Sequence, residues 1–290
     1  AIGQPVLMEI YKEFFNRFGL EVAQILLSKH DLIGSRKRFI NTRNTFNALR
    51  GMKVIPVVNE NDSVAVDEIK FGDNDTLSSY VAGLIGADLL IMLSDIDGLY
   101  LDDPARSPGS DVILEVSARD PVLSKISKGG TSFFGTGGIT SKIEAAKMAA
   151  KFGIPTIIAN GKRKNILMDI FQGKKYGTFI FPEERLKGKR RWIGFYSTPK
   201  GRIFVDSGAK DALLTKGKSL LPSGIIKVEG SFKRGDVVYI SDEAGNDFAK
   251  GLTNYSSEEV KKIMGKNSRE ISNILGYKYR DEVVHRDDMY

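Results

Sequence analysis

The stretch Leu89-Leu90-Ile91-Met92-Leu93-Ser94-Asp95-Ile96-Asp97-Gly98 decides the fold class. Its first five residues are apolar and are followed at once by a polar turn. An uninterrupted apolar run of this length predicts a β-strand buried on both faces, which is typical of parallel sheets. In such sheets ligands bind beyond the carboxyl ends of the strands. Ser94 and Asp95 are therefore candidate ligand-binding residues. The alternative is that Asp95 and Asp97 only shape the turn before Gly98.

Strand and helix patterns alternate on both sides of this stretch. Apolar runs predict further strands over residues 21–27, 53–58 and 156–159. Apolar residues at helical spacing predict helices, which cover residues 4–18, 36–50, 76–86, 141–152 and 166–171. This alternation indicates an α/β domain in which helices cover both faces of a mainly parallel sheet.

Composition excludes several classes of protein. The chain has 290 residues, enough for one to two domains, and 41% of them are apolar. It contains no cysteine and only two histidines, which excludes disulfides and thiolate metal sites and disfavours His-based triads. Neither a membrane-spanning run nor a signal-peptide pattern is present, so we expect a cytoplasmic protein without a membrane partner.

The C-terminal third has a different character. Residues 182–190 form a charged linker, and short β patterns separated by turns follow, over residues 201–206, 225–229, 237–241 and 248–252. This spacing predicts a small β-barrel. Residues 186–290 hold 20 Lys and Arg against 14 Asp and Glu. The excess indicates either a nucleic-acid surface or a solvated face.

Two polar runs carry the candidate chemistry. The first joins Asn59 and Asp62 to Asp73, Asn74 and Asp75. Asp62 or Asp75 suits an ammonium group, and Asn74 with backbone amides suits a carboxylate. The alternative is that residues 73–76 simply cap the helix that follows. An acidic cluster can also hold Mg²⁺, although with ATP the phosphates normally hold most of it.

The second polar run, Gly135-Thr136-Gly137-Gly138-Ile139-Thr140-Ser141-Lys142, precedes a helix. Ser141 and Glu144 have the spacing of a capping box, so we expect Ser141 to cap this helix. Glycines, helix-start amides and Lys142 together suit phosphate oxygens. The run does not match the Walker A pattern. A glycine-rich turn with a solvated lysine is the alternative.

Taken together, these motifs resemble the amino-acid kinase family, and most closely its members that phosphorylate glutamate. The resemblance spans nearly the whole chain and rests on residues 57–62, 68–75, 93–100, 135–142, 217–225, 230–237 and 284–289. It implies a mainly parallel sheet between layers of helices, followed by a small C-terminal barrel similar to a PUA domain. The implied boundaries are a kinase domain over 1–185, a linker over 186–197, a PUA-like domain over 198–276 and a tail over 277–290.

The resemblance implies transfer of a phosphoryl group from MgATP to the γ-carboxylate of L-glutamate, as the first step of proline biosynthesis. Asp62 and Asn74 would bind glutamate, with Asn59, Asp73 and Asp75 beside them. The nucleotide would contact Ser94, Asp95, Thr136, Gly137, Gly138, Ile139, Thr140, Ser141 and Lys142. Lys142 would be catalytic by offsetting charge on the transferred group, and no covalent intermediate is needed. No protein-held metal site is implied.

One departure from the family is evident at the start of the chain. The family opens with a strand, a lysine and a phosphate-covering Gly-Ser/Thr turn, and a later Ser-Gly-Ala segment helps to hold glutamate. The 290 residues contain none of these. We therefore expect residues 1–290 alone to be inactive unless that part is supplied.

The resemblance also implies partners. L-proline would act as a feedback inhibitor, and the protein would form a dimer or tetramer. Either the apolar helix 4–18 or the lysine-rich loop 101–134 would contribute to it. RNA binding through the PUA-like domain is a rival main function. Other acceptors used in the family, such as aspartate, acetylglutamate, carbamate or UMP, are rivals with the same fold. Residues 101–134 are either a lid over the substrates or a surface loop.

Overall fold

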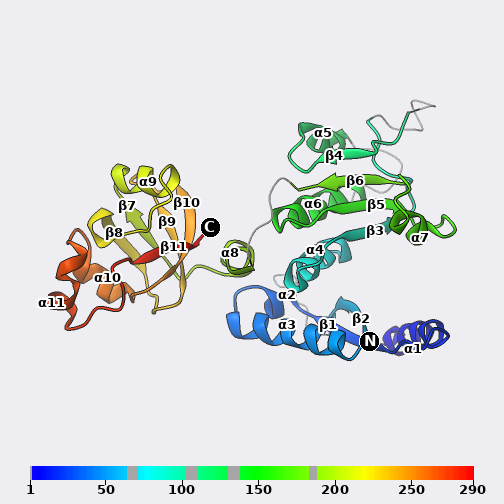
Figure 1. Cartoon of the computed structure of the whole chain (residues 1–290), viewed down its shortest axis with the longest axis horizontal. Helices are drawn as coiled ribbons and strands as arrows, with labels where there is room; N and C mark the ends of the chain where they lie inside the picture. Colours follow the sequence, from blue (N-terminus) through cyan, green and yellow to red (C-terminus); the bar gives the residue numbers. More distant parts are fainter. Residues whose placement is uncertain (1, 64–70, 102–109, 130–137, 183–187) are drawn as a thin grey trace. The chain divides into compact units, whose positions relative to one another are not determined.

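The computed structural model describes all residues except 1, 64–70, 102–109, 130–137 and 183–187. The chain divides into two compact units (Figure 1). Unit 1 comprises Ala1–Leu32 and Lys37–Leu186, and unit 2 comprises Ile33–Arg36 and Lys187–Tyr290. In the described ranges, each helix is too short or too polar to cross a membrane.

The described residues of unit 1 form two sheets. One is a parallel pair of β1 (Val22–Leu27) and β2 (Ile55–Glu60). The other has the order β3-β5-β6-β4, with bounds Leu90–Ser94, Thr156–Asn160, Thr178–Phe181 and Glu115–Ser117. In this second sheet β5 and β6 are antiparallel, whereas β3–β5 and β4–β6 are parallel. The predicted α/β class with mainly parallel pairing is therefore confirmed.

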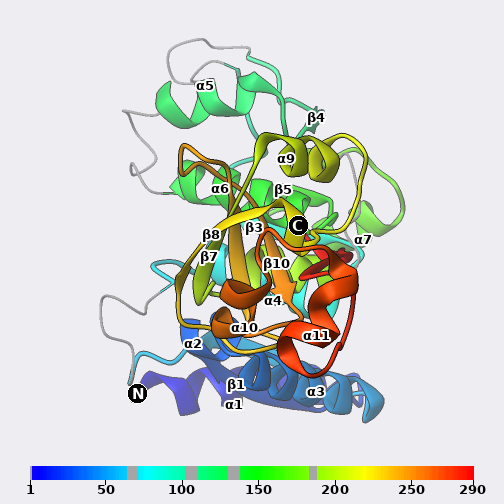
Figure 2. The same ribbon diagram turned by 90° about the vertical axis from the view of Figure 1, so that its left-hand side faces the viewer.

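Helices cover these sheets. Unit 1 contains α1 (Gly3–Asn16), α2 (Lys29–Leu32), α3 (Arg36–Gly51), α4 (Asn74–Ile85), α5 (Pro121–Gly129), α6 (Gly138–Lys151) and α7 (Ile166–Phe171). Helix α4 contacts both β2 and β3 and packs along α6. Figures 1 and 2 both show α1, α3 and the β1–β2 pair at one end of unit 1, with α5 and β4 at the other end.

The alanines of α6 explain how this helix approaches the second sheet. Ala145, Ala146 and Ala149 are at most 2% exposed, and small side chains permit a short distance between helix and sheet. Ile143 on the same helix joins a core that includes Ile158 of β5. Helices α4 and α6 are thus held by packing against each other and against strands of this sheet.

The prediction that residues 89–93 are buried on both faces is wrong for part of the strand. Met92 is 5% exposed, but Leu93 is 47% exposed. Strand β3 lies at the end of its sheet, and its only sheet neighbour among the described residues is β5. An apolar run is therefore compatible with an edge strand as well as a central one.

Unit 2 is built on one sheet with the order β11-β10-β9-β7-β8. The bounds of these strands, in that order, are Val284–Met289, Asp247–Thr253, Val237–Ser241, Gly201–Val205 and Ile225–Gly230. Around the sheet lie α8 (Gly188–Arg191), a π-helical turn (Trp192–Tyr196), α9 (Ser207–Leu214), α10 (Ser257–Ile263) and α11 (Ile271–Leu275). The core includes Ile203, Val238 and Ile240, all fully buried. Strands β7 to β10 were expected from the sequence, whereas β11 and α9 were not.

Candidate active site

The first turn of α4 is fixed by Asp73. Its Oδ1 accepts a hydrogen bond from the backbone N–H of Thr76 at 2.6 Å, and its Oδ2 accepts from Thr76 Oγ1 at 3.2 Å. Asp73 is therefore the N-cap, which confirms that one residue of this run caps the helix. Gly72 precedes it with φ +90°, a left-handed conformation that favours glycine. The exposed Asn74 is the first residue of the helix.

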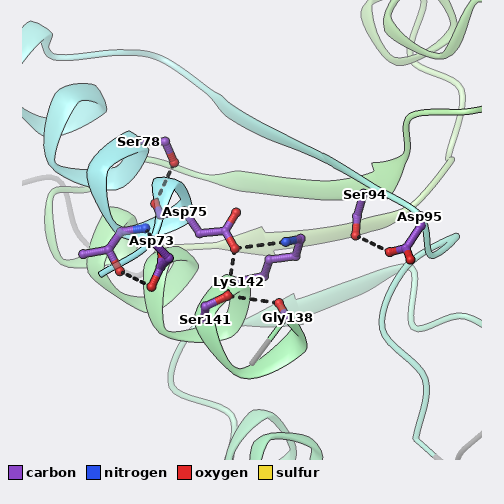
Figure 3. Close-up of polar contacts among 9 residues, drawn as sticks. Asp73, Asp75, Ser78, Ser94, Asp95, Gly138, Ser141 and Lys142 are labelled. Carbon is purple, nitrogen blue, oxygen red and sulfur yellow. Dashed lines mark hydrogen bonds and ion pairs between the residues drawn. The ribbon is translucent and has the colours of Figure 1, made fainter. Parts of the chain in front are cut away.

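Asp75, one residue further on, points away from its own helix and toward α6 (Figure 3). Its Oδ2 accepts from Lys142 Nζ at 2.9 Å and from Ser141 Oγ at 2.8 Å. The Lys142 and Asp75 side chains are 16% and 22% exposed. Charges this sheltered from water interact more strongly than surface charges. The pair therefore holds the lysine ammonium at a defined position between α4 and α6.

The prediction that Ser141 caps α6 is wrong. The helix begins at Gly138, so Ser141 lies in its first full turn rather than before it. Its hydroxyl donates to Gly138 O at 3.1 Å as well as to Asp75. A serine can bond to a preceding carbonyl inside a helix, and here that geometry also turns the hydroxyl toward α4.

The other residues of the glycine-rich run fall into two groups. Thr136 and Gly137 lie outside the described residues. Ile139 packs against the core of unit 1, and Thr140 Oγ1 donates to Ser127 O at 3.3 Å. Within the described part of this run, only Ser141 and Lys142 contact Asp75.

Ser94 and Asp95 lie at the carboxyl end of β3, as predicted for a ligand-binding edge. Ser94 Oγ donates to Asp95 Oδ1 at 3.1 Å. Figure 3 draws this pair in the same view as the Asp75–Lys142 group, and no hydrogen bond joins the two among the residues drawn. The neighbouring strand β5 ends at Asn160, whose amide donates to Asp97 Oδ1 at 2.9 Å. This bond fixes the turn that follows Asp95.

Asn59 is the last residue but one of β2, and Asp62 lies in the turn that follows this strand. Asn59 Oδ1 accepts from the backbone N–H of Glu60 at 2.9 Å. Asp62 is exposed in a turn and forms no hydrogen bond or ion pair with another residue in the described part of the chain. The structure therefore joins Asp75 to Lys142, while Asp62 stays a prediction.

This arrangement suits a reaction between two anionic groups. The amides of Asn74 and Asp75 lie at the positive end of α4, which favours an anion such as a carboxylate. Lys142 provides a cation at the start of α6. Within the ranges that the structure describes, no three His, Cys, Asp or Glu side chains gather in a way that could hold a metal ion.

Comparison with known sequences identifies the fold. The sequence profile of the amino acid kinase family matches residues 1–160, and that of the PUA domain matches residues 201–275. The chain belongs to the amino acid kinase family. Its sequence is 51% identical over 291 residues to the glutamate 5-kinase of Dictyoglomus turgidum, covering 100% of this chain and 77% of that protein. It is 49% identical over 290 residues to the glutamate 5-kinase of Caldanaerobacter subterraneus subsp. tengcongensis, covering 100% and 78%.

For this amino acid kinase the sequence placed Asp75 among the substrate-binding residues and did not predict its bond to Lys142. The two residues are 67 positions apart. Helical periodicity and capping patterns concern residues that are a few positions apart, so neither can predict a contact between residues this far apart in sequence. Only the packing of α4 along α6 reveals it.

Proposed function

We infer that the chain has glutamate 5-kinase activity: it transfers the γ-phosphoryl group of ATP to the γ-carboxylate of L-glutamate, the first step of proline biosynthesis. The observation that carries this inference is identity of about one half to glutamate 5-kinases over the whole chain. The pairing of Asp75 with Lys142 across α4 and α6 supports it, because it holds a cation where a transferred phosphoryl group could be stabilised.

Lys142 is the proposed catalytic residue. A phosphoryl group in transfer carries negative charge on its oxygens, and a fixed ammonium stabilises that charge. Lys142 donates to Asp75, which also accepts a hydrogen bond from Ser141, so the lysine needs little reorganisation when ATP binds. Because the γ-carboxylate is already a competent nucleophile, no general base is required. Asp75 is therefore proposed to position Lys142.

Glutamate binding is proposed at the ends of β2 and α4. Asn74 and the first-turn amides of α4 suit a carboxylate, since the amide dipoles favour negative charge. Asp62 suits the substrate ammonium, and its exposed side chain makes no competing bond to another described residue. Asn59 and Asp73 support the same region through their bonds to Glu60 and Thr76.

ATP binding is proposed between the carboxyl end of β3 and the start of α6. Ser94 and Asp95 would contact the nucleotide on one side, and residues 136–142 would contact its phosphates on the other. Mg²⁺ would be bound mainly by these phosphates and would neutralise part of their charge.

We also propose that the protein forms an oligomer through α1 and that L-proline inhibits it at the glutamate site. Helix α1 has no buried residue, and Val6, Ile10 and Phe14 are 58%, 48% and 54% exposed. An apolar face of this kind indicates an association surface. Light scattering of the wild type and of Phe14→Ser would test the first proposal, and proline titration of the kinase assay the second.

The direct test of the function is an ADP-release assay on the full-length gene product with MgATP and L-glutamate. Hydroxylamine would trap the acyl phosphate, and aspartate and acetylglutamate would be compared as acceptors. Turnover with glutamate alone, lost in Asp62→Ala, would support the assignment. Turnover with another acceptor would overturn the substrate. No turnover by folded protein would favour RNA binding by the PUA domain as the main function.

A further inference from the structure

Glu60, the last residue of β2, bonds to a distant part of the chain. Its Oε1 accepts a hydrogen bond from the backbone N–H of Phe71 at 2.7 Å. The two residues are 11 positions apart in sequence. Glu60 itself is held in the sheet, in register with Leu27 of β1. The bond therefore connects a fixed strand end to the segment that leads into α4.

Phe71 has a second anchor, through its ring. The ring lies 5.7 Å from that of Tyr80 on α4, and Tyr80 in turn lies 6.0 Å from Phe152, which is fully buried. Aromatic pairs at such distances add to the stabilisation from burial. Phe71 is thus fixed at its backbone by β2 and at its ring by α4.

These anchors lie immediately before the proposed glutamate site. Only Gly72, with φ +90°, separates Phe71 from the N-cap Asp73. Asn74 follows Asp73 directly. Because only two residues lie between Phe71 and Asn74, fixing Phe71 restricts where Asn74 can lie, although the glycine alone would be flexible. Loss of the Glu60 bond would therefore displace the first turn of α4 or broaden its range of positions.

We propose that Glu60 is a positioning residue for substrate binding, which acts by holding the Phe71 backbone so that Asn74 and the start of α4 meet the substrate carboxylate. This role rests on the proposed function, since the substrate is L-glutamate. Among the described residues, Glu60 accepts its side-chain hydrogen bond through one oxygen, Oε1. Glutamine has an oxygen of the same reach, so it can replace the glutamate, whereas alanine cannot.

The experiment compares Glu60→Gln and Glu60→Ala in the full-length gene product. For Glu60→Ala we expect the KM for glutamate to rise about tenfold, while kcat and the KM for ATP change less than about twofold, because one hydrogen bond to a charged group is lost. Glu60→Gln should stay within about threefold of the wild type. Glu115→Ala, a carboxylate in β4 that pairs with the exposed Lys175, is the matched control and should leave all constants unchanged.

Hydrogen exchange of the Phe71 amide tests the anchoring role of Glu60 independently of kinase activity. Exchange should accelerate about tenfold in Glu60→Ala and remain near the wild-type rate in Glu60→Gln. If Glu60→Gln loses glutamate binding as strongly as Glu60→Ala, the charge itself matters, and direct contact with the substrate replaces the positioning role. Unchanged exchange and KM in Glu60→Ala would also overturn the inference. A wild type that does not phosphorylate glutamate would instead refute the function, and the exchange rates would still decide whether Glu60 anchors Phe71.

Discussion

Each unit of the molecule contains a lysine–aspartate pair that joins distant elements, and the two pairs have different surroundings. In unit 1, Lys142 of α6 meets Asp75 of α4 at 2.9 Å. In unit 2, Lys210 of α9 meets Asp242, which follows β9, at 2.8 Å. The bond lengths are nearly equal. The difference lies in what else each aspartate and each lysine contacts.

Asp242 is occupied by its own turn. It accepts from the backbone N–H of Asn246 at 2.9 Å, and the Lys210 ammonium lies 5.6 Å from the centre of the Phe248 ring. These contacts indicate that the Lys210–Asp242 pair stabilises the fold of unit 2. Asp75 instead lies in the first turn of a helix, next to the exposed Asn74 and opposite the start of a second helix. The difference teaches that an ion pair alone does not indicate a ligand site. The site proposed in unit 1 depends on the first turns of two helices that the pair joins.

The two pairs should differ most in how kcat responds when the lysine is removed. Lys142→Ala should lower kcat by about 10²- to 10³-fold, the range found when one group that stabilises a developing negative charge is removed. Lys210→Ala is the matched control and should leave kcat unchanged. The hydroxylamine-coupled assay measures both. Equal losses in the two variants would show that Lys142 acts through folding, and no loss in Lys142→Ala would contradict its catalytic role.

The next effect concerns the aspartates. Asp75→Asn should lower kcat by about 10- to 100-fold, because a hydrogen bond to a charged group contributes about 1.5–3 kcal/mol and each 1.4 kcal/mol corresponds to tenfold in rate. Asp242→Asn should leave kcat unchanged. A rise in the KM for glutamate at constant kcat in Asp75→Asn would instead place this carboxylate in contact with the substrate.

The smallest effect is a pH dependence confined to unit 2. The hydrogen bond from Lys210, followed by that from the Asn246 backbone, lowers the pKa of Asp242 from 3.8 to about 2. A carboxylate whose pKa is lowered on folding stabilises the folded state at pH values above its unfolded pKa. Its contribution is therefore complete above about pH 4 and is lost as the pH falls toward about 2.

Trp192, the only tryptophan in the chain, lies in unit 2 and reports its unfolding by fluorescence. Urea titrations should show Asp242→Asn less stable than the wild type at pH 6, with the difference shrinking between pH 4 and pH 2. Asp281→Asn serves as a control, since the exposed Asp281 pairs with Lys278 on the same unit. A difference that is constant with pH would mean that Asp242 contributes through its shape rather than its charge.

Much of the fold was accessible from the sequence. The alternation of apolar runs and helical spacing predicted β2, β3, β5, α3, α4 and α7 close to their observed bounds. The polar run at 73–76 predicted a helix cap, and Asp73 provides it. These features are local, because they depend on backbone hydrogen bonds and side-chain spacing within a few residues.

Tertiary structure decided the remainder. It placed the start of α6 at Gly138 instead of after Ser141, left Leu93 exposed on an edge strand, and added β11 to the sheet of unit 2. The bonds from Lys142 to Asp75 and from Phe71 to Glu60 span 67 and 11 positions. Sequence determined which residues were chemically suited to glutamate and ATP. Which of them meet was decided by the packing of α4 against α6 and β2, because contacts between distant segments depend on how whole elements bury their apolar faces.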